Sequence, residues 1–599
     1  MTAAVATWVA LGVALAAARV TLRRRGVFLL GRHGHLIAPA ALGTVWLAGL
    51  MLGQATRSLI GMVFVAALPL VALAIVSYRN FSRHSSRHAI FTRLDLLMVI
   101  HMGVVFWVVN LWDIECHRAI VGQFLHGNLP PTAINDPRAP LAYHATYDAL
   151  VAVVLTALPL DLEQGMAVAS IACLTLTIAN LRCLTRLLFR SPVVGQLGRA
   201  LFVYGFGPVL IRYFIEGFSL DGLHGGTSQS YVDIILRRPA GLGFALFTLA
   251  LSLLLPFYRS IRAGGGTPPT TPLAQRQVLL RLLLLLPVCA LLPQTAEETT
   301  LFLGVLIAPL VVARRLRWPW VALLGVALAV GLLQSGVVRG VLGQGSMATP
   351  HMRPSWPPTL PSWRFRDDGA VIWSGNGLTI LSLEFGPVFL ASLLMGLFGK
   401  DERRRVLMAV FLAGLVAALF IKAPGWPKSD LDRFLFYGTP SVFMLSAALV
   451  EWLQRRYPGL QDRPARLKAL AVGFAVVMCG PPFVVPTHHA AGPLEGSFFR
   501  HAFGGDLKRN LKVVAPREPI LTTTQRADEL IQAGFMVVAP LDSNSIGRIT
   551  EEHFDEYLRN HAADAAWLFL PENDARVKNQ PVEGRDGSFV LVRAPMRQR

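Results

Sequence analysis

The chain has 599 residues, of which 53% are hydrophobic and only 15% are charged, and its mean hydropathy is +0.50. These values exclude an ordinary soluble protein and indicate a polytopic membrane protein. The net charge of +20 does not indicate nucleic-acid binding, because the arginines stand in short clusters between apolar runs, as is typical of cytoplasmic loops beside acidic lipid headgroups.

The first apolar run, residues 3–20, lacks a clear small-residue cleavage site after it, which favours a retained membrane span over a cleaved signal. Neither a disulfide framework nor a zinc module is expected, because most of the cysteines lie in or beside apolar runs and none forms a CxxC pair. The cysteines are at positions 116, 173, 183, 289 and 479.

Long apolar runs alternate with basic segments through most of the chain, and the first four runs are 3–20, 36–53, 58–77 and 95–111. Because basic segments favour the cytoplasmic side, this alternation predicts about fourteen spans with both chain ends on the outer side. The expected divisions are N-terminal helices in 1–94, a transmembrane core in 95–489 and a soluble domain in 490–599.

A polar stretch from Trp112 to Asp148 follows the fourth run and is expected on the outer side of the membrane. It begins with two carboxylates, Asp113 and Glu115, at the mouth of a helix. Ionisable groups at that depth are costly unless they bind something, so the stretch is the first candidate for a functional site. On a helix Asp113 and His117 would face each other, as a base with its orienting group or as two metal ligands.

The next apolar run, residues 145–160, is too short to cross the membrane, because a helix of about 16 residues rises about 24 Å against a hydrocarbon core of about 30 Å. We therefore expect it to lie along the outer surface, with only residues 164–181 crossing. That topology also places Arg182, Arg186 and Arg190 on the cytoplasmic side, where arginines are favoured.

The composition becomes that of a soluble protein from about residue 490. A small α/β domain on the outer face is predicted there, because short β-branched and aromatic runs alternate with an amphipathic segment, 551–560. Its expected strands are 520–523, 535–540, 565–570 and 588–592. The domain holds no phosphate-binding glycine loop, and we interpret it as an accessory or acceptor-docking module.

The outer segments mix carboxylates with a few cations, whereas the inner loops are basic. A carboxylate near a reacting hydroxyl is a general base, and an arginine or lysine nearby holds a phosphate leaving group. This pairing suits transfer of a sugar from a lipid-phosphate donor whose tail stays among the helices.

The spacing W-D-x-E-x-H…G-x-x-P-P…P-L-x-Y-H within residues 112–148 resembles the GT-C superfamily of membrane glycosyltransferases, and most of all the bacterial and archaeal YYY group. Over residues 95–490 only the architecture is similar. The resemblance implies an all-α polytopic GT-C-like fold of about fourteen transmembrane helices with a small C-terminal extracytoplasmic α/β domain. It also implies inverting transfer of a sugar from a polyprenyl-phosphate donor.

By the same resemblance, Asp113 is the catalytic base and Glu115 supports it or holds a metal. Candidates for binding the donor and its phosphate are Arg433, Arg138, His144 and Tyr143. Candidates for supporting roles, or for ligating a divalent Mg or Mn ion, are His117, Asp148, Asp221, Glu297 and Glu298.

Each of these candidate residues also has a purely structural interpretation. Asp113 and Glu115 can be an acid pair that ends a helix, the histidines hydrogen-bonded loop residues, and Glu297 and Glu298 a solvated turn. Arg433 can be a snorkelling side chain and Tyr143 an interfacial aromatic, since both residue types are common at membrane boundaries.

The sequence thus predicts an integral-membrane glycosyltransferase of the bacterial cytoplasmic membrane, with its active site and C-terminal domain extracytoplasmic. Its partners would be a polyprenyl-phosphate sugar donor, an envelope glycan, lipid or protein as acceptor, and membrane lipids, but no nucleic acid. Two alternatives remain: a transporter or flippase of lipid-linked saccharide, which would carry polar groups across the bilayer midplane, and a non-catalytic envelope scaffold.

Overall fold

The structure is a computed structural model of the chain. It describes residues 2–25, 33–79, 90–108, 115–131, 141, 145–160, 162–205, 239–258, 272–296, 298–335, 353–354, 394, 396, 399, 401–422, 434, 437–461, 463–491, 505–515, 518–523, 526, 529–530, 535, 537–538 and 566–594.

Most of the described residues form a bundle of helices, as the apolar runs predicted. In its first half the helices are α1 (Thr2–Arg25), α2 (Gly34–Leu52), the 3-10 turn η1 (Gly53–Thr56), α3 (Leu59–Arg79), α4 (Arg93–Val108), α5 (Glu115–His126), α6 (Thr146–Ala157), α7 (Leu162–Leu188) and α8 (Pro192–Tyr204). In its second half they are α12 (Pro239–Tyr258), α13 (Pro272–Leu291), α14 (Thr299–Val312), α15 (Trp318–Ser335), α18 (Glu402–Phe420), α20 (Gly438–Arg456), α21 (Pro458–Gln461) and α22 (Pro464–Ala491).

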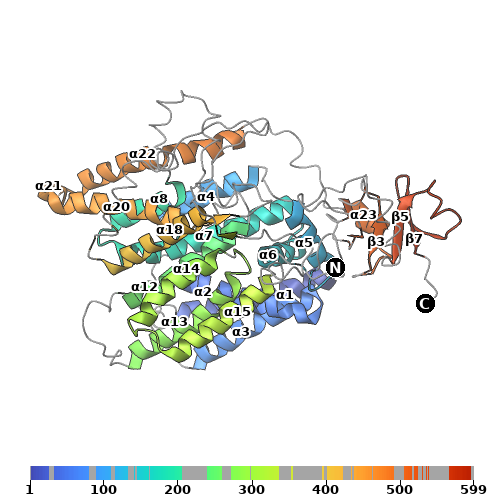
Figure 1. The fold of residues 1–599 in the computed structure, drawn as a ribbon, viewed down its shortest axis with the longest axis horizontal. Coiled ribbons are helices and arrows are strands. Elements are labelled where there is room, and N and C mark those ends of the chain that lie inside the picture. The colour runs from blue at the N-terminus through green and yellow to red at the C-terminus, as the bar shows by residue number, and fades with distance from the viewer. Residues whose placement is uncertain are drawn as a thin grey trace.

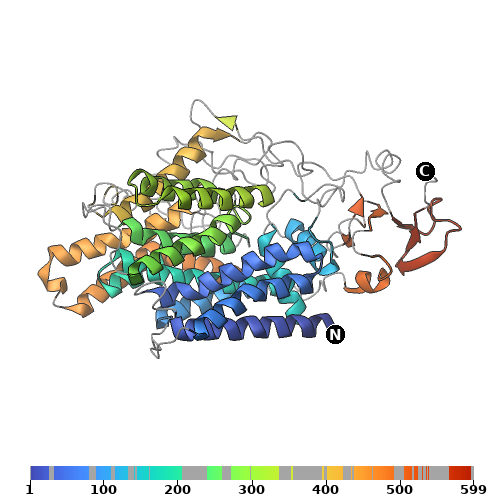
Figure 2. The same ribbon diagram turned by 90° about the horizontal axis from the view of Figure 1, so that it is seen from below.

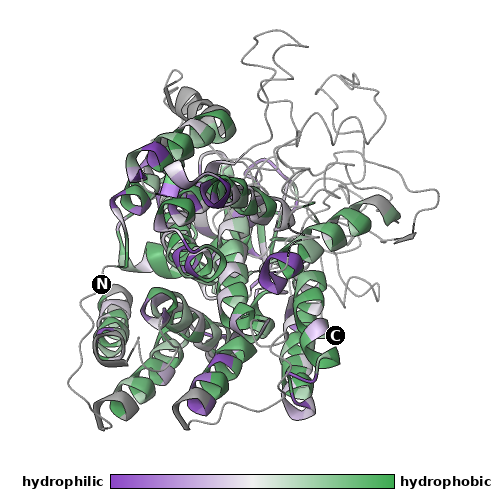
Figure 3. Ribbon diagram, turned by 90° about the vertical axis from the view of Figure 1, so that its left-hand side faces the viewer, coloured by the Kyte–Doolittle hydropathy of each residue, from purple (hydrophilic) through white to green (hydrophobic). Residues whose placement is uncertain are grey.

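Several helices expose apolar faces that suit a lipid environment rather than water. On α15 the exposed side chains include Leu323, Val326, Val330 and Leu333, whose spacing of three and four residues puts them on one face. Figure 3 shows that the bundle helices are mostly hydrophobic. In the part of the chain that the structure describes, four helical segments are long and apolar enough to cross a membrane: Gly34–Thr56, Leu162–Leu188, Ala240–Tyr258 and Trp318–Ser335. The predicted count of fourteen spans is therefore not confirmed.

The bundle has two distinct ends, which Figures 1 and 2 show along the horizontal axis. Helices α5 and α6 lie toward one end, and the C-terminal sheet lies beyond it. The short helix α21 lies at the opposite end. Helix α6 has 12 residues and rises about 18 Å, so it is too short to cross a bilayer. Eight of those residues are buried, because α6 packs against both α5 and α7.

The C-terminal part contains α23 (Gly505–Asn510) and a five-stranded sheet, which confirms a small sheet after the helical bundle. The strands are β3 (Ile520–Thr522), β4 (Val537–Val538), β5 (Trp567–Pro571), β6 (Val582–Asp586) and β7 (Phe589–Arg593). Their order is β4-β3-β5-β7-β6, with β3 parallel to β4 and β5, and β7 antiparallel to β5 and β6. The predicted helix at 551–560 lies outside the described residues.

Two of the inner strands, β5 and β7, are buried almost along their whole length because both of their faces are covered. Strand β6 was not predicted, since its sequence, Val582–Asp586, is polar and mostly exposed. It lies at the edge of the sheet and carries an irregularity between Val582 and Gly584, which is typical of edge strands.

Candidate functional site

Two residues of the predicted first outer loop form a buried pair. The Nδ1 atom of His117 lies 3.0 Å from Oδ1 of Asp148 and 3.2 Å from Oδ2. The side chains are only 1% and 0% exposed. The two residues are 31 positions apart in the sequence, so the pair ties the start of α5 to the start of α6 and closes the loop between them.

Local sequence explains why His117 points inward. Helix α5 buries His117, Ile120, Val121 and Phe124, which recur every three or four residues and so share one face. The histidine therefore belongs to the apolar face of a helix, although the sequence left it open as an ordinary loop histidine.

The partner, Asp148, is held by the way α6 packs on α7. Its neighbour Tyr147 is buried, and the Tyr147 hydroxyl donates to the carbonyl of Met166 at 3.0 Å and lies 2.8 Å from the Ser170 hydroxyl. Asp148 stands in the first turn of α6, where the positive end of the helix dipole favours a carboxylate. Rigid support of this kind fixes the carboxylate before any ligand binds.

The geometry of the His117–Asp148 pair sets the chemistry that the imidazole can perform. When the carboxylate accepts a hydrogen bond from Nδ1–H, it fixes the tautomer and the orientation of the imidazole and raises the basicity of the other ring nitrogen. Histidines so held act as general bases or as metal ligands. A buried carboxylate also needs such a partner, since removing it from water alone is costly.

Polar contacts beside the pair connect three helices of the bundle, α6, α13 and α15. The hydroxyl of Thr146 donates to the carbonyl of Gln294 at 3.3 Å, which joins the start of α6 to the turn after α13. The amide nitrogen of Gln294 then donates to Oε1 of Gln334 at 2.8 Å, close to the end of α15. These residues were not singled out from the sequence, because uncharged polar residues at the end of an apolar run carry no distinctive signal.

Two short strands that lie far apart in the sequence also meet. Strand β1 (Arg353–Pro354) pairs antiparallel with β2 (Ile421–Lys422). Further along, the ring of Tyr437 packs against Phe244 of α12 and Phe302 of α14, with ring centroids 4.6 Å and 6.0 Å away. In the sequence Tyr437 comes four residues after the predicted phosphate-binding Arg433, which lies outside the described residues.

Of the predicted site residues, the structure brings together His117 and Asp148. Glu115 is the first residue of α5, but its side chain is not among those described. Glu298 is half-buried at the N-cap of α14 and makes no side-chain capping hydrogen bond. The others lie outside the described residues: Asp113, Arg138, Tyr143, His144, Asp221, Glu297 and Arg433.

The predicted divalent metal could be ligated at the His117–Asp148 pair, which supplies an imidazole and a carboxylate. Mg and Mn prefer oxygen ligands, which Asp113 and Glu115 would add. Within the described ranges, however, no group of three or more His, Cys, Asp or Glu side chains is placed to hold a metal ion. The metal therefore stays a prediction.

Comparisons with known proteins were made for the whole chain. No family model matches it, and no curated protein matches it. Among solved structures it is similar to archaeal oligosaccharyltransferase AglB from Archaeoglobus fulgidus in complex with an inhibitory peptide and a dolichol-phosphate, at 13% identity and a TM-score of 0.37. The oligosaccharyltransferase of the same organism in the apo form gives 14% identity and a TM-score of 0.38. In both cases the match covers 80% of this chain and 69% of the other. Similarity at this level is too low to show a shared fold, and the proposals below rest on the residues of this chain.

Proposed function

We propose that the chain is an integral-membrane glycosyltransferase of the GT-C type that works on the outer face of the cytoplasmic membrane. The donor is a polyprenyl-phosphate-linked sugar and the acceptor is an envelope glycan, lipid or protein. The observation that carries the proposal is the buried His117–Asp148 pair, because it joins the start of α5, which begins at Glu115 shortly after Asp113 in the sequence, to the start of α6.

In the proposed reaction Asp113 takes the proton of the acceptor hydroxyl. The acceptor oxygen then bonds to the anomeric carbon of the sugar as the bond from that carbon to the phosphate oxygen breaks, with inversion. Polyprenyl phosphate leaves with the electron pair, and Arg433 or Arg138 stabilises its charge. Glu115 supports Asp113, while His144 and Tyr143 contact the donor.

The buried pair is assigned a positioning role. His117 follows Asp113 by four residues and Glu115 by two in the sequence, so in this proposal the pair positions the segment that carries both acids. Positioning of this kind lowers a reaction barrier because the reacting groups meet already oriented. A divalent metal bound at these acids would supply charge stabilisation for the leaving phosphate.

The remaining features agree with this assignment. The exposed apolar faces of the bundle keep a polyprenyl tail in an apolar environment beside the helices. The C-terminal sheet lies beyond the end of the bundle that holds α5 and α6, where an acceptor would approach (Figure 1). The proposal includes the fourteen-span topology and an extracytoplasmic location for that sheet.

The experiment measures sugar transfer in membranes that contain the full-length chain. Radiolabelled polyprenyl-phosphate hexoses are the donors, and incorporation into the lipid, glycan and protein fractions is the readout. Asp113→Asn is expected to abolish transfer at unchanged protein level in the membrane. Glu572→Gln, which removes one partner of an exposed ion pair in the C-terminal part, is the control and should transfer normally.

Three other outcomes would each contradict the proposal. Full activity of Asp113→Asn removes the catalytic assignment. Movement of the labelled lipid across the membrane without incorporation by the wild type indicates a flippase. If the wild type neither transfers the sugar nor moves the labelled lipid with any donor, the result indicates a non-catalytic scaffold.

A further inference from the structure

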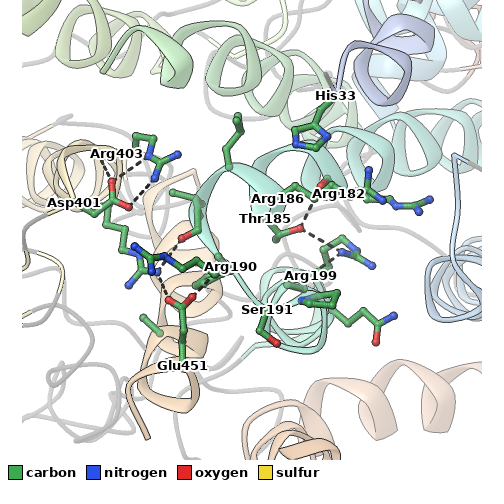
Figure 4. A pocket seen from close by; sticks show the side chains of 18 of the residues that line it. His33, Arg182, Thr185, Arg186, Arg190, Ser191, Arg199, Asp401, Arg403 and Glu451 are labelled. Atoms are coloured by element: carbon green, nitrogen blue, oxygen red, sulfur yellow. Dashed lines mark hydrogen bonds and ion pairs between the residues drawn. The ribbon is translucent and has the colours of Figure 1, made fainter. Parts of the chain in front are cut away.

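A large cavity lies at the end of the bundle away from α5 and α6. It has a volume of about 1040 Å³ and lies between the turn that joins α7 to α8, the start of α18 and the end of α20 (Figure 4). Along α7, Arg186 at the cavity follows Ser170, the partner of Tyr147, by 16 residues, which corresponds to about 24 Å. The cavity is thus separate from the candidate site around His117.

The cavity is strongly basic. Its lining includes seven arginines but only three carboxylates. The arginines are Arg182, Arg186, Arg190, Arg199, Arg403, Arg404 and Arg455, and the carboxylates are Asp401, Glu402 and Glu451. A concave surface lined by one sign of charge concentrates ligands of the opposite sign.

Most of the arginines already have carboxylate partners. Glu451 is almost fully buried and pairs with both Arg404 and Arg455. Asp401 pairs with Arg403 at 3.0 Å. Burial by itself would raise the pKa of Asp401, but the hydrogen bonds and the charge of Arg403 outweigh it and hold that pKa below its ordinary value. Asp401 therefore stays ionised and neutralises Arg403.

Deeper in the cavity Arg199 is neutralised in the same way. Its Nε lies 2.7 Å from Oδ1 of Asp95, and both side chains are buried. By contrast, Arg186 and Arg190 are exposed at the cavity, and in the part of the chain that the structure describes neither side chain has a hydrogen-bond or ion-pair partner. Arg182, which also lines the cavity, is buried, so these two exposed guanidinium groups are the positive charge most accessible to a ligand.

The backbone adds to this charge at the same place. Helix α8 begins at Pro192, beside Arg190, and its N-cap residue Ser191 makes no side-chain capping hydrogen bond. Ser191, Pro192 and Gly195 all line the cavity, so the positive end of the α8 dipole faces it. A helix N-terminus of this kind binds anions through its backbone N–H groups, and here it stands next to two unneutralised arginines.

We propose that this cavity binds a phosphate-bearing anion, either a phosphomonoester or a diphosphate, between Arg186, Arg190 and the N-terminus of α8. Phosphate is the chemical class that matches, because a planar guanidinium presents paired donors to phosphate oxygens and a helix N-terminus favours a compact anion. The volume of the cavity is that of a site for a small molecule or a lipid headgroup. The site goes beyond the proposed transferase reaction, since it lies at the other end of the bundle.

The experiment uses the full-length protein in a non-ionic detergent and isothermal titration calorimetry. One arm titrates inorganic pyrophosphate, and the other titrates mixed micelles that contain phosphatidic acid, with phosphatidylcholine as the neutral comparison. The test variant is Arg186→Gln with Arg190→Gln. The matched control is Arg317→Gln with Arg456→Gln, which removes the same charge from two exposed arginines that do not line the cavity.

The test variant is expected to bind at least about tenfold more weakly than the wild type, because two charge-assisted contacts are lost, whereas the control binds as the wild type does. A tenfold loss in the pyrophosphate arm assigns a soluble phosphate compound, and a loss confined to the phosphatidic-acid arm assigns a lipid headgroup. The proposal is overturned if the wild type binds neither probe. It is equally overturned if the test and control variants weaken binding alike, since that result indicates diffuse surface charge.

Discussion

Removing the carboxylate of Asp148 tests the buried pair most directly. In Asp148→Ala the imidazole of His117 keeps its place in an environment where it is 1% exposed, but loses its partner. An unsatisfied buried polar group costs about 1–3 kcal/mol, and one left charged costs about 3–5 kcal/mol. Little of this is screened by water at such burial, and the group left behind is a polar imidazole, so we expect a loss of about 1–3 kcal/mol in the free energy of unfolding.

The conservative change separates charge from hydrogen bonding. In Asp148→Asn the amide oxygen can still accept from His117 Nδ1–H, so only the charge-assisted part of the bond is lost, about 1–2 kcal/mol. Asp574→Ala is the control. It removes a carboxylate that bonds only to a partly exposed arginine, Arg576, and it should cost less than about 1 kcal/mol.

The assay is denaturant unfolding of the purified protein in detergent, completed as a double-mutant cycle with His117→Ala. A direct interaction between His117 and Asp148 predicts a coupling energy of about 1.5–3 kcal/mol. Additivity of the two single changes within about 0.5 kcal/mol would refute the reasoning, because it would mean that the two side chains do not stabilise each other.

Two further changes test other buried contacts. Asp95→Ala leaves the buried guanidinium of Arg199 without its carboxylate and should lower the free energy of unfolding by about 3–5 kcal/mol, measured by the same titration. Gly243→Ala would place a Cβ atom 2.1 Å from the Tyr437 hydroxyl, so the aromatic ring must shift at a cost of about 1–3 kcal/mol. Gly241→Ala, whose Cβ would meet its nearest neighbour at 3.8 Å, is the matched control, and equal thermal stability of the two glycine variants would contradict the contact.

The helical architecture was largely predictable from the sequence. The apolar run at 36–53 became α2 (Gly34–Leu52), and the run at 58–77 became α3 (Leu59–Arg79). Long apolar runs bounded by arginine clusters are a strong signal, because only helices satisfy their own backbone hydrogen bonds in lipid. The strand predicted at 520–523 also matches β3.

The pairing of His117 with Asp148 could not be predicted in the same way. Both residues were candidates, but the sequence favoured Asp113 as the partner of His117 because they are four apart. The observed partner lies 31 positions away and depends on α5 packing against α6. No periodicity within either helix encodes that contact.

The basic cavity shows a different limit of sequence reasoning. Arg186 and Arg190 were interpreted as topology signals, which explains why arginines lie at that end but not whether they bind a ligand. Their site depends on α18 and α20, which are more than two hundred residues further along the chain. Asp95 stands at the first position of the apolar run 95–111, and neither it nor its partner Arg199 was singled out from the sequence.

The middle of α7 separates the two ends of the bundle and bears on the transporter alternative. Between Ser170 and Arg182 the described polar side chains of this helix are Thr175, Thr177 and Asn180. Each donates a hydrogen bond to a backbone carbonyl: the two threonines to their own helix and Asn180 to Ala245 of α12. Hydrogen bonds of this kind hold helices together, although Oδ1 of Asn180 is buried without a hydrogen-bond partner among the described residues. A transporter is expected to carry ionisable or unwound groups at this depth, and among the described residues of α7 the polar side chains between Ser170 and Arg182 are uncharged.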